Sequence, residues 1–170
     1  MRRLQVKSQT LQSLAVALVL AAVAGAQTKM SGTIQCGKPD PQHMIEAGDR
    51  ANHSYMIGKV NCTWTKTFEI AGVQSKDGGS TFFEEISGNS SRGHAVHTTT
   101  MANGDKAYVR YQGTSTYKDG APQSAEGKWS FTGGTGKLKG LKGQGTTKGK
   151  AGADGSVTYE IEGEYQLPTK

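Results

Sequence analysis

The chain has 170 residues, and its 20 Lys and Arg against 14 Asp and Glu give a formal net charge of +6. Without the first 26 residues, 17 cations and 14 anions remain, so that the net charge falls to +3. An excess this small, without a concentrated basic stripe, argues against a dedicated nucleic-acid surface, and the length suits one domain.

The first 26 residues have the three parts of a secretory signal peptide. A cationic start precedes an apolar run over 11–24, and small residues ending at Ala26 meet the requirement of signal peptidase. The run is shorter than the roughly 20 apolar residues of a membrane anchor. We expect cleavage after Ala26 and a secreted or periplasmic protein with no later membrane association. The pair Arg2-Arg3 leaves a twin-arginine signal as the alternative export route.

The remaining chain is expected to hold a short extension and one domain. Residues 27–52 are predicted to be an N-terminal extension with a first short strand, in which 42–51 could hold one helical turn. Residues 53–170 are predicted to form the barrel domain argued below.

The two cysteines, Cys36 and Cys62, both follow the signal peptide. In an oxidising compartment an even number of cysteines usually means pairing. Strand alternation places Cys36 on the side of Ile34, and Cys62 on the side of Val60 and Trp64. We therefore predict a Cys36–Cys62 disulfide, worth about 3 kcal/mol through loop closure. Metal ligation is the alternative, but the chain has no CxxC motif and no histidine at ligand spacing nearby.

Alternation of apolar and polar residues by two predicts strands along this whole part of the chain. Apolar side chains share one face over 60–70, at Trp129 and Phe131, and over 157–167, where Gly163 could mark a bulge. Turn signals occur at Asp77-Gly78-Gly79, Asn103-Gly104-Asp105, Lys118-Asp119-Gly120 and Asp154-Gly155.

These patterns predict an all-β fold. Seven or eight antiparallel strands, with 24 glycines in the chain and no helix-forming run after residue 26, indicate an eight-stranded β-barrel. A barrel leaves no exposed sheet edges, and glycines let a small sheet bend enough to close. A β-sandwich is the alternative.

The densest local pattern is the glycine-rich stretch over 133–145. It lacks the glycine and Ser/Thr spacing of a phosphate loop and the third glycine of a dinucleotide fingerprint. Gly133, Gly134, Thr135 and Gly136 are therefore predicted to form a structural turn.

The longer stretch 129–140, WSFTGGTGKLKG, resembles the glycine-rich hairpin of the allene oxide cyclase and dirigent barrel superfamily. The resemblance implies a small eight-stranded barrel with a lipocalin-like outline, in a secreted bacterial branch. The acidic catalytic residues of the plant enzymes have no motif-matched counterpart here. The resemblance therefore implies a fold and carries over no activity.

The titratable residues indicate no catalytic group and no metal or cofactor site. His94 and His97 are three residues apart on a predicted strand and point to opposite faces. Glu84 and Glu85 are adjacent and diverge in the same way.

The glycine-rich region also carries five lysines. They are interpreted as a solvated strand face, with an anionic partner such as a polysaccharide or nucleic acid as the alternative. The five are Lys137, Lys139, Lys142, Lys148 and Lys150.

Two hypotheses of function follow. The first is a non-enzymatic exported module that holds a small apolar ligand or a partner in the barrel. The second is an enzyme of the barrel superfamily, of isomerase or cyclase type. The candidates for residues lining a ligand pocket are Glu69, His97, Tyr108 and Tyr111.

Overall fold

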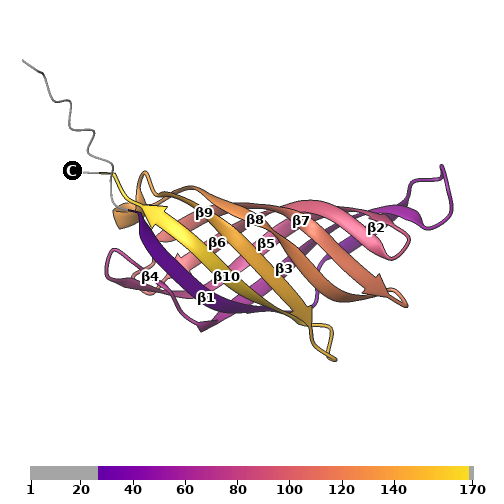
Figure 1. Cartoon of the computed structure of the whole chain (residues 1–170), viewed down its shortest axis with the longest axis horizontal. Helices are drawn as coiled ribbons and strands as arrows, with labels where there is room; N and C mark the ends of the chain where they lie inside the picture. Colours follow the sequence, from indigo (N-terminus) through magenta and orange to yellow (C-terminus); the bar gives the residue numbers. More distant parts are fainter. Residues whose placement is uncertain (1–26, 169–170) are drawn as a thin grey trace, which may run out of the picture.

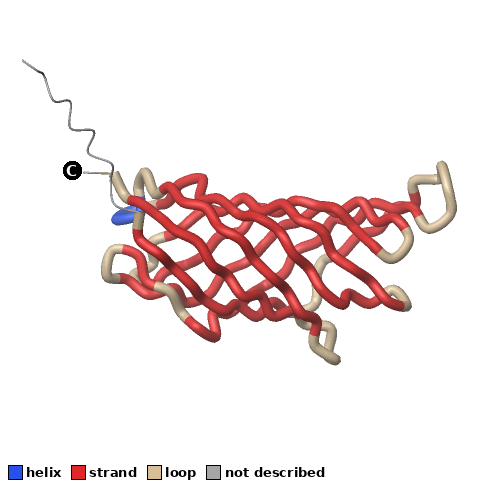
Figure 2. The backbone as a smooth tube through the Cα atoms, in the orientation of Figure 1, coloured by secondary structure: helices blue, strands red, loops and turns tan. Residues whose placement is uncertain are grey.

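In a computed structural model, which describes residues 27–168, the chain forms a closed eight-stranded antiparallel β-barrel (Figures 1 and 2). The barrel strands follow the order β3-β1-β10-β9-β8-β7-β6-β5, and pairing of β3 with β5 closes the ring. The barrel strands are β1 (Thr28–Cys36), β3 (His53–Lys66), β5 (Val73–Ser87), β6 (Ser90–Met101), β7 (Lys106–Lys118), β8 (Ala121–Gly134), β9 (Lys142–Ala151) and β10 (Val157–Gln166). Two short strands, β2 (Gln42–Glu46) and β4 (Glu69–Ile70), and the 3₁₀ helix η1 (Gly136–Leu138) complete the fold.

Alternation along each strand separates a solvent face from an interior face, as the pattern of residue types requires. In β10, Tyr159 and Ile161 pack against the core, whereas Glu160 and Glu162 are exposed. In β8, Trp129 lies inside and packs edge-on against Phe131. The all-β, eight-stranded barrel that the sequence predicts is thus the fold of the protein.

One end of the barrel is closed by an apolar plug. The largest fully buried side chains gather there from β4, η1 and the segments beside them. Figure 1 shows β4 at the same end as η1 and the tip of β10. The plug consists of Ile70, Met101, Leu138 and Leu141.

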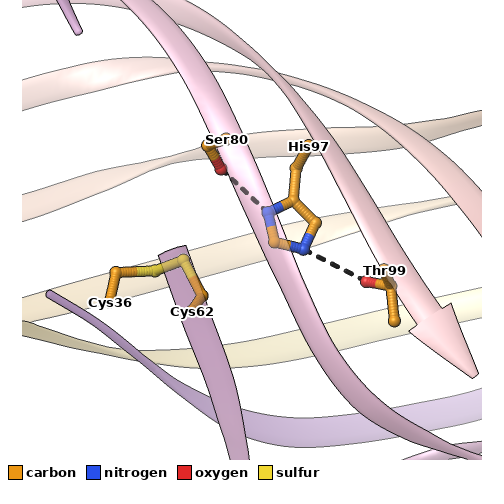
Figure 3. Close-up of a disulfide and its surroundings, with 5 residues drawn as sticks. All are labelled: Cys36, Cys62, Ser80, His97 and Thr99. Atoms are coloured by element: carbon orange, nitrogen blue, oxygen red, sulfur yellow. Dashed lines mark hydrogen bonds between the residues drawn. A yellow bond between two sulfur atoms is a disulfide. The ribbon is translucent and has the colours of Figure 1, made fainter. Parts of the chain in front are cut away.

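The predicted disulfide is confirmed. Cys36 and Cys62 are directly opposite each other in the β1–β3 pairing, and both are buried (Figure 3). The bond therefore ties the end of the first barrel strand to its neighbour.

Residues 27–52 contribute the strands β1 and β2 to the sheet. β1 pairs with β10 on one side and with β3 on the other. The expectation of a helical turn within 42–51 is wrong, because Gln42–Glu46 forms β2 and pairs with the first half of β3. In Figure 1 the β2–β3 loop projects from the end opposite η1.

The turn predictions have mixed outcomes. The segments around Gly104, Gly120 and Gly155 are turns, and each of these glycines has a positive φ. The Asp77-Gly78-Gly79 prediction is wrong, because the segment lies within β5. Gly78 is needed there for packing, since a Cβ on it would come within 2.7 Å of the His97 ring.

The expectation of a bulge at Gly163 is also wrong. The register runs unbroken through Gly163 toward both β1 and β9. The turn predicted for 133–136 is only partly correct, because Gly133 and Gly134 lie within β8, where they pair with Tyr108 and Ala107. The chain turns from Thr135 into η1, and Gly136 has a positive φ. Asp105 supports this turn by accepting a hydrogen bond from the Lys137 backbone N–H at 3.0 Å.

The predicted signal peptide lies outside the described residues. Between residues 27 and 168, no helix is long and apolar enough to cross a membrane.

Candidate functional site

The interior of the barrel holds a cavity of about 690 Å³. It reaches the turns β5–β6, β7–β8 and β9–β10 at Asn89, Gly120 and Gly155. Figure 1 shows these turns at the end opposite β4 and the tip of β10, so the cavity opens at the end opposite the apolar plug. Its wall is mainly aliphatic and aromatic. Volume and lining are those of a site for one small organic molecule.

The cavity is open because large side chains lie against the wall instead of filling the centre. Trp129 covers Gly145 and Gly163 on the neighbouring strands, where an added Cβ would come within 2.6 Å and 2.5 Å of its ring. Tyr111 covers Gly113 and Gly127 in the same way, at 2.2 Å from its hydroxyl and 2.5 Å from its ring. Glycine at these inward positions therefore leaves room at the barrel axis.

A carboxylate stands in this wall. Glu84 points inward between Phe82 and Ile86, which line the cavity with it. Its Oε2 accepts hydrogen bonds from the hydroxyls of Tyr117 and Ser91, both at 2.6 Å. Oε1 makes no hydrogen bond, and Glu84 forms no ion pair, with any residue in the range 27–168. The fold thus holds this carboxylate by two neutral donors on one oxygen.

The tyrosines around Glu84 are kept protonated. Burial, and then the hydrogen bond to Glu84, raises the pKa of Tyr117 well above its ordinary value. Burial also raises the pKa of Tyr111, and it raises the pKa of Tyr159 to about 12. At neutral pH these phenols are donors and carry no charge.

A histidine lies deeper in the barrel. His97 Nδ1 is 2.8 Å from the Ser80 hydroxyl oxygen, and Nε2 is 3.1 Å from that of Thr99 (Figure 3). Burial lowers the pKa of His97 to about 4. The ring is therefore neutral at physiological pH. Its protonated nitrogen donates a hydrogen bond to one of the two hydroxyls, and its other nitrogen accepts one from the second hydroxyl.

Two buried polar atoms in the wall have no protein partner. They are the indole N–H of Trp64 and the hydroxyl of Thr147. Both residues line the cavity. The two atoms themselves are covered by neighbouring atoms, so each is an unpaired polar group inside the wall.

The four candidate pocket residues fall in different places. His97 and Tyr111 line the cavity. Tyr108 is 37% exposed, and it points away from the interior because it lies three positions before Tyr111 on β7. Glu69 is exposed on β4, beside the closed end.

Glu84 and Tyr117 belong to the site although neither was among the candidates. The adjacent pair of glutamates does diverge as expected, with Glu84 inside and Glu85 bonded to His53 and Arg92. The signal for Glu84 was its position, two residues from both Phe82 and Ile86. An apolar face at i−2 and i+2 places the residue between them inside the barrel.

The five lysines of the glycine-rich region are all exposed. Lys148 lies opposite Glu160 on β10 and opposite Glu126 on β8. Opposite charges thus face each other across neighbouring strands there. In the range 27–168, no three His, Cys, Asp or Glu side chains are grouped to hold a metal ion.

No protein-family model and no curated protein sequence matches the chain. Among solved structures, a pterocarpan synthase dirigent protein shares 13% identity with it, with a TM-score of 0.46 over 85% of this chain and 87% of that one. A protein of the DUF3224 family, of unknown function, from Shewanella oneidensis MR-1 shares 15% identity, with a TM-score of 0.47 over 85% and 100%. A pyocyanin demethylase shares 16% identity, with a TM-score of 0.42 over 78% and 98%.

Proposed function

We propose that this chain is an exported binding protein that holds one small, largely apolar molecule inside its barrel. The observation that carries the proposal is the cavity of about 690 Å³, open at one end and lined mainly by apolar and aromatic side chains. Cavities of this size and lining are typical of small-molecule sites. The Cys36–Cys62 bond and the leader-like first 26 residues support an extracellular or periplasmic location.

Native mass spectrometry of the protein purified from its own source tests this function. We expect a population heavier than the processed chain by the mass of one small molecule, which organic extraction removes. The same spectra give the mass of the processed chain and so test cleavage after Ala26. A protein that is always empty, and that takes up no lipophilic probe, would refute the proposal.

A second candidate is an isomerase or cyclase type of enzyme, and Glu84 favours it. A carboxylate with one oxygen free of protein partners, beside the Tyr117 hydroxyl, is equipped to move a proton on a bound molecule. The variant Glu84→Gln separates the two candidates. If the protein is an isomerase or cyclase, the variant should retain unreacted substrate, whereas the unmodified protein holds product. The two molecules then have the same mass but different chromatographic retention. A binding protein predicts the same molecule from both.

A further inference from the structure

We propose that the molecule held in this barrel carries a single positive charge, a protonated amine or comparable nitrogen cation, that pairs with Glu84. The inference rests on the proposed binding function and specifies the class of ligand. The apolar body of the ligand lies deeper, among the aromatic rings of the wall.

The first argument is the hydrogen-bond count at Glu84. An ionised carboxylate accepts about four hydrogen bonds through its two oxygens. The fold supplies two, from Tyr117 and Ser91, and both reach Oε2. The other carboxylate that lines the cavity, Glu46, is exposed on β2. Oε1 of Glu84 is therefore the carboxylate oxygen inside the barrel wall that is free for a ligand, and an N–H bearing a positive charge is the donor that such an oxygen binds best.

The second argument is the charge inside the barrel. Lys38 is the one Lys or Arg among the described residues that line the cavity, and it lies at the rim, close to the charge of Asp154. Arg92 is on the outer face and pairs with Glu85. His97 is neutral. The interior thus carries a negative charge without a matching cation, which repels anionic ligands and favours cationic ones.

The third argument is the set of aromatic rings in the cavity wall, of which Tyr111, Tyr117 and Tyr159 are close enough to Glu84 that, besides burial, its charge raises their pKa. Tyr111, Tyr117, Tyr159 and Trp129 line the same cavity as Glu84. The faces of such rings attract cations, with Trp the strongest. A cation loses much of its hydration on entering the barrel, and its interactions with the carboxylate and the rings replace those with water.

The fourth argument is access. Glu84 is two inward positions from Gly88, which lies on the rim of the cavity, whereas His97 is deeper. The charged end of a ligand at Glu84 therefore remains close to solvent, which limits the cost of desolvating the ion pair. Its apolar end reaches the inner part of the cavity.

Displacement of a neutral fluorescent probe, N-phenyl-1-naphthylamine, provides the test. Three competitors with the same ring system are compared at neutral pH: 1-naphthylmethylammonium, the neutral 1-ethylnaphthalene, and the anionic 1-naphthoate. We expect the cation to bind about tenfold or more tightly than the neutral compound, and the anion to bind most weakly.

The matched variants are Glu84→Gln and Glu85→Gln, which remove adjacent carboxylates on opposite faces of β5. Glu84→Gln is expected to abolish the preference for the cation and to leave binding of 1-ethylnaphthalene within about twofold. Glu85→Gln is expected to retain the preference.

The possible failures are distinguishable. If the neutral probe does not bind at all, the proposed binding function fails. If the probe binds but the three competitors displace it equally in the unmodified protein, the cationic ligand is refuted while the binding function stands. A preference that persists in Glu84→Gln would place the negative charge elsewhere and would also refute the proposal.

Discussion

Acidification should destabilise the barrel through His97, and the variant His97→Gln should remove that effect. The imidazole lies inside the barrel between Ser80 and Thr99, and burial lowers its pKa from 6.5 to about 4. The unfolded chain binds a proton at this residue as the pH falls through 6.5, whereas the folded protein does so only near pH 4. Stability due to neutral His97 is therefore present above pH 6.5 and is lost between these two values.

The two pKa values set the size of the effect. A separation of roughly 2.5 pH units corresponds to about 3 kcal/mol when the loss is complete. Between pH 7 and pH 5 the same two values give a loss of about 2 kcal/mol. His53 acts in the opposite direction, because its hydrogen bonds to Asp49 and Glu85 raise its pKa and its contribution is present at low pH.

Urea unfolding at a series of pH values from 7 to 5 measures this loss. We compare the unmodified protein with His97→Gln and with His94→Gln, which changes an exposed histidine on the other face of β6. The contributions of His53 and of the carboxylates are common to all three proteins and cancel in the comparison. His97→Gln should lose about 2 kcal/mol less than the other two over this range. Equal losses in all three proteins would refute the interpretation that His97 is held neutral by burial.

Three further predictions concern stability. Replacing Cys36 and Cys62 together by Ser should lower the free energy of unfolding by about 3.5 kcal/mol, the loop-closure value for the sequence separation of 26, and an unchanged urea midpoint would contradict it. Gly136→Ala should lower the free energy of unfolding by at least about 1–2 kcal/mol, because φ is +51° and the new Cβ would collide with the Asp105 carboxylate. Equal melting temperatures of the variant and the unmodified protein would contradict this conformation of the turn. Gly145→Ala should lower the free energy of unfolding by about 2 kcal/mol or more and shift the fluorescence emission of Trp129, because the new Cβ would meet both the Trp129 ring and the backbone oxygen of Glu162. Thr146→Ala, on the outer face of β9, is the control and should change neither quantity.

The sequence sufficed for the fold class and the disulfide because both depend on alternation. Side chains on a strand point to opposite faces in turn, so Cys36 and Cys62 could be placed inside from their apolar neighbours Ile34, Val60 and Trp64. Register then brought the two cysteines opposite each other.

Alternation and local turn propensity did not predict the backbone conformation correctly where it depends on pairing with residues far away in the sequence. Asp77-Gly78-Gly79 has the composition of a turn, but it continues β5 because β3 and β6 pair with it on both sides, and the glycine at 78 leaves space for the His97 ring. Likewise β2 forms because β3 extends past the end of β1 and leaves backbone groups for Gln42–Glu46 to pair with.

The cavity was the least predictable feature. Whether a barrel is filled or open depends on where its aromatic rings lie, and Tyr111 lies flat because glycines face it on β7 and β8. The pairing of Glu84 with Tyr117 and Ser91 depends equally on the stagger of three strands. Neither relation is visible in a single sequence.

The central claim is that the interior of this barrel is an open site for one small molecule. Titration with N-phenyl-1-naphthylamine, followed by the fluorescence of the probe, tests this claim most directly. It is done on the unmodified protein and on two variants. Ala95→Phe places a ring in the cavity, and Val96→Phe places the same ring on the outer face of β6. We predict saturable binding of one probe per chain to the unmodified protein and to Val96→Phe, and a loss of about tenfold or more in affinity for folded Ala95→Phe. Equal probe binding by all three proteins, or none by any of them, would contradict the account.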